Sequence, residues 1–198
     1  VEYLTELAVG SGVPTPTRSN GVQRAAKARL YVADLDCARR DGHVTVHGVT
    51  FAVRDHEIYG LAGVSGNGQT ELAEAMTGVQ APISGTIEIA GVGNVAKSTA
   101  GSRRDVGVAS IPADRYAYGL AGDLSVVDNL VAGGLRDGRY GGWARIDTAR
   151  MRRDAAASID AFDVQGVRGL GQKAALLSGG NAQKLVLARE LGGSPKIV

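Results

Sequence analysis

A glycine-rich stretch in the first third of the chain restricts its fold more than any other feature. Residues 63–70 read GVSGNGQT, follow the apolar run at 58–62 and precede a helical pattern at 70–77. A short apolar run indicates a buried strand, so the three segments predict a strand–loop–helix unit. Such a loop brings backbone N–H groups together at a helix N-terminus, where they bind phosphate. The sequence therefore predicts an α/β fold with a phosphate site at this loop.

The loop follows the phosphate-binding pattern G-x-x-x-x-G-K-[ST] at all but one position. Gly66 and Gly68 let the backbone approach a phosphate, and the Thr70 hydroxyl is placed to ligate Mg²⁺. Gln69 replaces the Lys, whose charge about 4 Å from a phosphate oxygen is worth roughly 4 kcal/mol at an effective dielectric of 20. We therefore expect binding with weakened stabilisation of the transferred phosphate. The candidate phosphate-binding residues are Gly63, Ser65, Gly66, Asn67, Gly68, Gln69 and Thr70.

Hydrophobic periodicity predicts that strands alternate with helices, with an antiparallel β segment at the start of the domain. Gly48 interrupts the alternation of the second strand and predicts a bulge there. Ser125 and Asp128 form a capping-box pattern that opens a helix. The expected strands are 30–35, 44–53, 58–62, 86–90 and 106–111, and the expected helices are 70–77, 125–131, 148–162 and 181–191.

Two segments divide the chain. Residues 1–28 combine a short amphipathic pattern with a stretch rich in Pro, Ser, Thr and Gly, which is typical of a linker. Residues 29–198 form the predicted domain, and the apolar residues before Val198 indicate another buried strand that is only beginning.

Charge and cysteine content indicate which classes of protein the chain does not belong to and which compartment it occupies. With 22 basic and 20 acidic residues, the formal net charge of +2 argues against a dedicated DNA-binding protein. Cys37 is the only cysteine, so no intramolecular disulfide forms, in agreement with a reducing compartment. No apolar run approaches the roughly 18 residues that span a bilayer, and no N-terminal signal is visible. We expect a cytosolic chain, and these observations leave open whether it docks on a membrane protein.

A second motif, LSGGNAQK at 177–184, opens a predicted helix with a Ser and two Gly residues, which form another phosphate cradle. Together with the upstream loop, this motif resembles the signature of the ABC-type ATPases. The resemblance implies an ABC-type P-loop NTPase fold with a helical subdomain that carries the signature. It also implies that the signature faces the nucleotide held by a partner domain. The matching residues are Leu177, Ser178, Gly179, Gly180, Asn181 and Gln183.

A third block lies between the two motifs: IPADR at 111–115, GL at 119–120, DLSV at 123–126 and NL at 129–130. It resembles the ATP-binding subunits of bacterial simple-sugar and nucleoside importers, each of which fuses two ABC domains. The loop is similar to that of a second domain, and residues 4–10 are similar to the end of a first.

The resemblance implies ATP and Mg²⁺ as cofactors, and a head-to-tail dimer with a second, tandem ABC domain. It implies transmembrane permease subunits as partners and, indirectly, a substrate-binding protein, without nucleic acid. The implied location is peripheral, on the cytoplasmic face of the cell membrane.

Several positions depart from the pattern of that family. Ala113 replaces a Glu in the coupling segment Ala113, Asp114 and Arg115, and Ala182 replaces a Gln. No aromatic residue that could stack on adenine occurs at 39–43. The acidic end of the Walker B strand and a later His would follow Val198, so we expect a truncated domain and an isolated chain with little or no ATPase activity.

Two other functions remain open at this point. One is a catalytically inactive nucleotide-binding module with a regulatory or structural role, which Gln69, Ala113 and the missing Walker B acid favour for the isolated chain. A truncated, non-functional remnant is a further form of this alternative. The other is an ABC ATPase that works on DNA or ribosomes, which the lack of basic arms and zinc-binding cysteines makes weaker.

Overall fold

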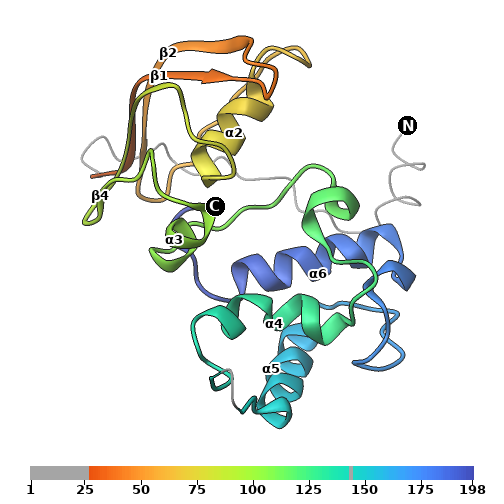
Figure 1. Cartoon of the computed structure of the whole chain (residues 1–198). Coiled ribbons are helices and arrows are strands. Elements are labelled where there is room, and N and C mark those ends of the chain that lie inside the picture. The colour runs from red at the N-terminus through yellow and green to blue at the C-terminus, as the bar shows by residue number, and fades with distance from the viewer. Residues whose placement is uncertain (1–26, 143–144) are drawn as a thin grey trace.

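The computed structural model describes residues 27–142 and 145–198. The short amphipathic pattern and nearly all of the linker expected within residues 1–28 lie outside these residues. Figure 1 shows two regions: a small sheet with helix α2 (Gln69–Thr77) against it, and a group of helices made of α4 (Val126–Arg136), α5 (Thr148–Ala161) and α6 (Gly179–Leu191). Helix α3 (Ala100–Asp105) lies between the two regions.

The sheet is antiparallel and has the strand order β2-β1-β3-β4. Its strands are β1 (Ala28–Ala38), β2 (Val44–Arg54), β3 (Ser84–Ile89) and β4 (Gly93–Asn94). This arrangement confirms the antiparallel segment and the three strands that alternation predicted at 30–35, 44–53 and 86–90.

The predicted bulge is also present. Leu35 lies opposite Val49 and Cys37 lies opposite Val46, so β2 carries one extra residue between these pairs. Gly48 occupies the extra position with a φ of 55°, in the left-handed region that glycine adopts without a steric penalty.

The apolar face of the sheet packs against α2. Val32, Leu35 and Ile87 are at most 1% exposed, and they meet Leu72 and Ala75 of the helix. The helix ends at Gly78, whose φ of 77° provides a left-handed C-terminal cap. This packing fixes the direction of α2, and with it the position of the loop that precedes the helix.

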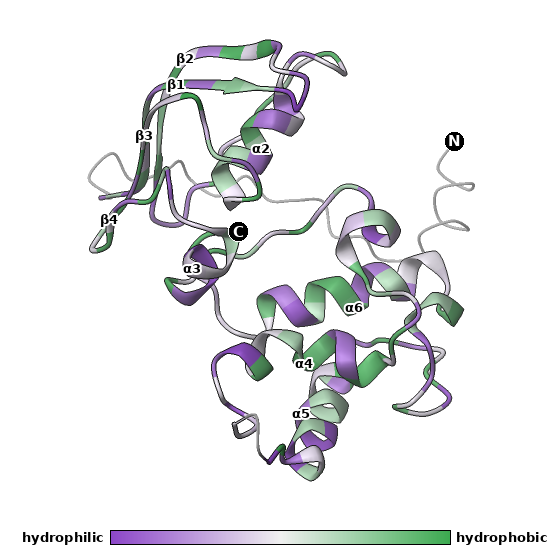
Figure 2. Ribbon diagram, in the orientation of Figure 1, coloured by the Kyte–Doolittle hydropathy of each residue, from purple (hydrophilic) through white to green (hydrophobic). Residues whose placement is uncertain are grey.

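The helical region contains α4 (Val126–Arg136), α5 (Thr148–Ala161) and α6 (Gly179–Leu191). Figure 2 shows apolar stretches on α4 and α6, and buried residues of the two helices pack in one cluster. The Ser125–Asp128 capping box opens α4 as predicted, with both of its reciprocal hydrogen bonds formed. A one-turn π-helix, η1 (Arg115–Gly119), and a 3-10 turn, η2 (Ala174–Leu176), complete this region.

Two predicted buried strands are wrong. Residues 58–62 form no strand, and Ile58 and Leu61 are 99% and 54% exposed. Residues 106–111 make only one bridge, a parallel one from Val108 to Ile197. A strand needs a neighbour that accepts its backbone hydrogen bonds, and the described residues supply none to 58–62.

Glu190 links α6 to the segment that joins α3 to the helical region. Its side chain is fully buried and accepts hydrogen bonds from Arg104 at 2.9 and 3.1 Å, from Arg189 at 2.8 Å and from the Ser110 N–H at 3.1 Å. Burial alone would raise the pKa of Glu190, but these bonds outweigh it and hold the pKa below its ordinary value.

We expect Glu190→Gln to lower the free energy of unfolding by about 2 kcal/mol at neutral pH, because two arginines then lose their charged acceptor. A carboxyl group with a lowered pKa stabilises the fold above its unfolded pKa, and this stabilisation disappears as the pH falls through the folded value. The difference between the variant and wild type should therefore shrink below about pH 4. Urea unfolding at several pH values measures it. The exposed Glu88→Gln is the control, and an equal loss in the two variants would contradict the role of Glu190.

Candidate functional site

The glycine-rich loop leads directly into α2, and the conformation of its last glycine excludes other residues. Gly68 caps the helix with a φ of 92°. A Cβ at this position would lie 2.7 Å from both the Thr45 carbonyl oxygen and the Val46 Cγ2 of β2. Gly66 also has a positive φ, of 90°. Strand β2 therefore packs directly against the loop, and only glycine fits at position 68, where the two backbones come closest.

The N-terminus of α2 has no side-chain cap. By contrast, α3, α4, α5 and α6 begin with Thr99, Ser125, Asp147 and Ser178, whose side chains accept a backbone N–H. The first-turn N–H groups of α2 thus lack the acceptor that a capping residue would supply. Free N–H groups and the positive end of the helix dipole together suit an anion.

The remaining side chains of the loop point to the same chemistry. The Gln69 side chain folds back against the Cα of Gly63, so its amide lies along the loop. Thr70, Ser65 and Asn67 are exposed at the loop surface. The loop as the structure shows it carries hydroxyl and amide donors and no basic side chain.

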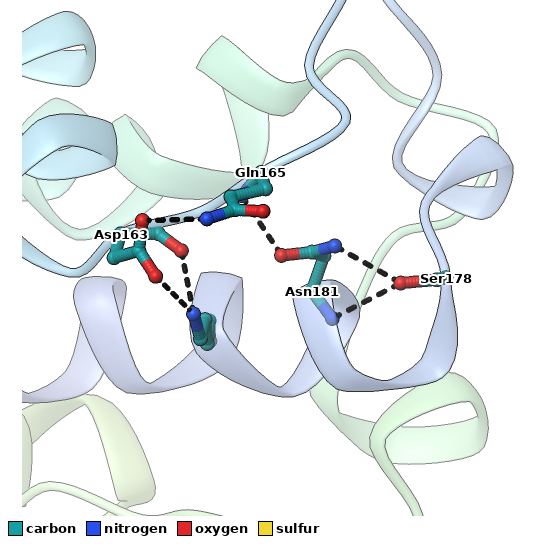
Figure 3. Close-up of polar contacts among 5 residues, drawn as sticks. Asp163, Gln165, Ser178 and Asn181 are labelled. Atoms are coloured by element: carbon teal, nitrogen blue, oxygen red, sulfur yellow. Dashed lines mark hydrogen bonds and ion pairs between the residues drawn. The ribbon is translucent and has the colours of Figure 1, made fainter. Parts of the chain in front are cut away.

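The second motif begins α6. The Ser178 hydroxyl accepts hydrogen bonds from the Asn181 backbone N–H at 3.5 Å and from its side-chain amide at 3.0 Å (Figure 3). The side-chain Oδ1 of Asn181 accepts a hydrogen bond from the backbone N–H of Gln165 at 2.8 Å. These contacts explain why Asn follows the two glycines: it fixes the start of α6 against the preceding loop, while Ser178 and Gly180 stay exposed.

An ion pair extends this network. Lys184 contacts Asp163 through the carboxylate at 2.6 Å and through the backbone carbonyl at 2.8 Å. Hydrogen bonds from Lys184 and from Gln165 hold the pKa of Asp163 below its ordinary value. Nothing in the sequence pattern indicates the Lys184–Asp163 pair, because the two residues are 21 positions apart and meet only in the folded chain.

Other signature positions serve the core. Leu177 and Ala182 are 5% and 0% exposed and belong to the cluster beneath α6. A Gln side chain at Ala182 would have to be buried among apolar groups, which accounts for the small residue there. Gln183 is half-buried on the same helix.

The coupling segment lies beside the second motif. Asp114 caps the π-helix η1 by accepting the N–H groups of Tyr116 and Ala117 at 2.9 and 3.0 Å. The Arg115 guanidinium lies 5.2 Å from the centre of the Tyr116 ring and packs against Gly179. Tyr116 also donates to the Leu177 carbonyl at 3.3 Å. The structure therefore brings the coupling segment and the signature together, while Ala113 at the segment's start presents no polar side chain.

The loop at 63–70 and the signature do not meet. The loop lies beside the sheet and the signature lies in the helical region (Figure 1). Within the described ranges, no hydrogen bond or ion pair connects them. A cavity of about 850 Å³ lies elsewhere, among α3, α4, α5 and α6. Each of its four arginines is already paired with a carboxylate: Arg104 and Arg189 with Glu190, Arg136 with Asp105 and Arg139 with Asp137.

Within the described ranges, no helix is both long and apolar enough to cross a bilayer.

Comparison with known proteins identifies the family. A family model described as "ABC transporter" matches residues 46–198. A glucose import ATP-binding protein of Haloferax volcanii is 41% identical over 151 residues, 76% of this chain and 27% of that protein. A nucleoside import ATP-binding protein of Lactococcus lactis is 31% identical over 197 residues, 100% of this chain and 38% of that protein. The chain thus spans well under half the length of these relatives.

Solved structures agree on the fold. One ATP-binding cassette of an ABC transporter superimposes with a TM-score of 0.66 at 17% identity, over 86% of this chain and 67% of that one. A component of an ABC transporter complex from Clostridium perfringens gives 0.62, also at 17% identity, over 85% of this chain and 63% of that one. The mixed α/β architecture with an antiparallel sheet is therefore that of an ABC ATPase. The chain belongs to the ABC transporter family, as an ATP-binding domain related to sugar and nucleoside import ATP-binding proteins.

Proposed function

We propose that this domain binds ATP in the ATP-binding subunit of an ABC importer for simple sugars or nucleosides. The observation that carries the proposal is the presence, in one chain, of two glycine-rich helix N-termini with separate roles. One is the uncapped start of α2, and the other is the Ser178-capped start of α6. The first suits binding of a nucleotide, and the second suits contact with a nucleotide held by another domain.

ATP fits the first of these sites. The loop N–H groups from Gly66 to Thr70 would hold the phosphates, and the Gln69 amide would donate to them in place of a lysine. The Thr70 hydroxyl would ligate Mg²⁺, which shields phosphate charge when bound. Because Gln69 carries no charge, this site should bind nucleotide more weakly than one with the full pattern and should stabilise the transferred phosphate less.

The partners follow from the second site. We infer that residues 29–198 form one ABC domain of a tandem pair, and that α6 presents Ser178 and Gly180 to the ATP of the other domain. Closure of the two domains around ATP would drive the transmembrane permease subunits, through the segment that begins at Ala113. A substrate-binding protein would act on the permeases, and the assembly would lie at the cytoplasmic face of the membrane.

A second candidate function is a nucleotide-binding module without catalysis. Gln69, which carries no charge, and Ala113, which has no polar side chain, favour it. A Gln69→Lys variant of the assembled protein separates the two. Increased ATP turnover would show that the site takes part in the cycle. Unchanged turnover would favour the structural module.

We expect Gly68→Ala to abolish saturable ATP binding to the loop. The added methyl group meets the Thr45 carbonyl and forces a positive φ on a residue with a Cβ, at a cost of about 2–3 kcal/mol to the local structure. Titration with a fluorescent ATP analogue measures the effect. Gly60→Ala is the matched control, because a Cβ there meets nothing within 4 Å and no positive φ is required.

Wild type and Gly60→Ala should bind ATP with the same affinity, and ADP but not adenosine should compete. A wild-type chain that does not bind ATP would contradict the proposed function, as would a Gly68→Ala variant that binds as wild type does.

A further inference from the structure

Arg39, at the turn of the β1–β2 hairpin, lies against the phosphate loop. Its Nη2 donates a hydrogen bond to the Gly66 carbonyl oxygen at 2.7 Å. Its Nε lies 3.4 Å from an Oε1 of Glu71, in the first turn of α2. Arg39 is thus a basic side chain that reaches the loop from a different part of the chain.

The backbone around Arg39 is held in place on both sides. Its N–H donates to the His43 carbonyl at 2.9 Å, and its carbonyl accepts the Gly42 N–H at 2.9 Å. The carbonyl of the preceding Ala38 accepts the side-chain amide of Gln80 at 2.6 Å. The hairpin itself contacts the loop where Thr45 and Gly68 approach each other. These hydrogen bonds fix the β1–β2 turn, and with it the position of Arg39 beside the loop.

The loop lacks the charge that Arg39 supplies. Residues 63–70 contain no Lys or Arg, and Gln69 offers only a neutral amide. A guanidinium has five N–H groups, and contacts with Gly66 and Glu71 leave several of them free. The Arg39 side chain is 42% exposed, so the residue is accessible to a ligand. Glu71 neutralises part of the charge, which limits the size of the expected effect.

Arginine suits this task because its planar fork forms charge-assisted hydrogen bonds with phosphate oxygens. We propose that Arg39 is the basic phosphate-binding residue of this site, and that it compensates for the lysine missing at Gln69. Its ligand is the phosphate chain of the nucleotide. The inference rests on the proposed function, since it assigns a further residue to the same site.

The test measures ATP affinity in the full chain for three variants. Arg39→Gln should weaken ATP binding about tenfold or more, because a charge-assisted hydrogen bond is lost. Arg39→Lys, which keeps the charge but loses the planar fork, should lose less affinity than Arg39→Gln. Arg40→Gln is the matched control: Arg40 is the next residue of the same turn, is exposed, and forms no hydrogen bond or ion pair with any residue that the structure describes.

Adding Gln69→Lys to Arg39→Gln tests whether Arg39 contributes charge to phosphate binding or only holds the loop in shape. If Arg39 supplies the charge, Gln69→Lys should raise ATP affinity more in the Arg39→Gln background than in wild type. If Arg39 only holds the loop through Gly66, Gln69→Lys gives the same gain in both backgrounds, and that result would overturn the inference. Equal losses in Arg39→Gln and Arg39→Lys would also overturn it, and so would binding by Arg39→Gln that equals wild type.

A different result would show that the proposed function is wrong. In that case the wild-type chain does not bind ATP, and the inference falls with it. When wild type binds ATP and Arg39→Gln binds equally well, the inference alone is wrong.

Discussion

Ser178→Arg should abolish transport by the assembled importer and reduce its ATP turnover about 100-fold or more. Ser178 is exposed at the start of α6, and its hydroxyl holds Asn181 in place. An arginine there removes the cap and fills the space where the proposed second domain presents its ATP. In the proposed assembly, hydrogen-bond donors at the start of α6 stabilise the charge that develops on the transferred phosphate. Their loss accounts for the expected decrease in ATP turnover of about 100-fold.

The measurement is uptake by cells that express the complete transporter. Ser178→Thr, which keeps a capping hydroxyl, is the control and should retain most of the uptake. Normal uptake by Ser178→Arg would contradict the assignment of this helix start to the signature role.

Arg103→Met should lower the free energy of unfolding by about 4 kcal/mol, a large share of the total stability of a domain of this size. The Arg103 side chain is 1% exposed and has no acidic partner among the residues described. Instead it donates to backbone carbonyls: Ala75 and Met76 in the last turn of α2, and Val95 and Ala96 after β4.

Burial lowers the pKa of Arg103, but an arginine stays protonated at neutral pH, so its charge also faces the negative end of the α2 dipole. Methionine fills much of the volume and leaves these carbonyls without donors. Urea unfolding followed by circular dichroism measures the loss, and Arg153→Met, on an exposed face of α5, should change the stability by less than about 0.5 kcal/mol. A similar small change for Arg103→Met would show that water replaces the lost hydrogen bonds.

Local patterns predicted the elements whose stabilising contacts are near in sequence. The alternation of Ile87 and Ile89 identified β3, and both residues are buried as expected. The spacing of Ser125 and Asp128 identified the start of α4, because both hydrogen bonds of the capping box join residues three positions apart.

Contacts between distant segments could not be predicted in this way. Residues 58–62 have the composition of a strand, yet strand formation depends on a neighbour, and composition does not reveal whether one is present. Arg103 and Arg39 look like surface residues in the sequence. Their roles arise because folding brings carbonyls 7 to 28 positions from Arg103, and the Gly66 carbonyl 27 positions from Arg39, into reach.

In the candidate site too, contiguous motifs could be predicted from the sequence, whereas contacts between distant residues could not. The two glycine-rich motifs could be found from sequence, since each is a continuous run that opens a helix. The groups that support them, such as Gln165 and Asp163 beside α6, become visible only in the folded chain (Figure 3).

In the proposed assembly, α6 faces ATP held by a second domain. The most direct test is the rate at which maleimide labels Ser178→Cys in the assembled protein. Burial, together with the nearby charges of Asp36 and Glu71, raises the pKa of Cys37 to about 11, so the native cysteine of this chain stays protonated and unreactive. ATP should slow labelling at Ser178→Cys about tenfold or more, while labelling at the exposed Ser102→Cys on α3 stays unchanged. A labelling rate at Ser178→Cys that ATP does not alter would show that the start of α6 does not face bound ATP.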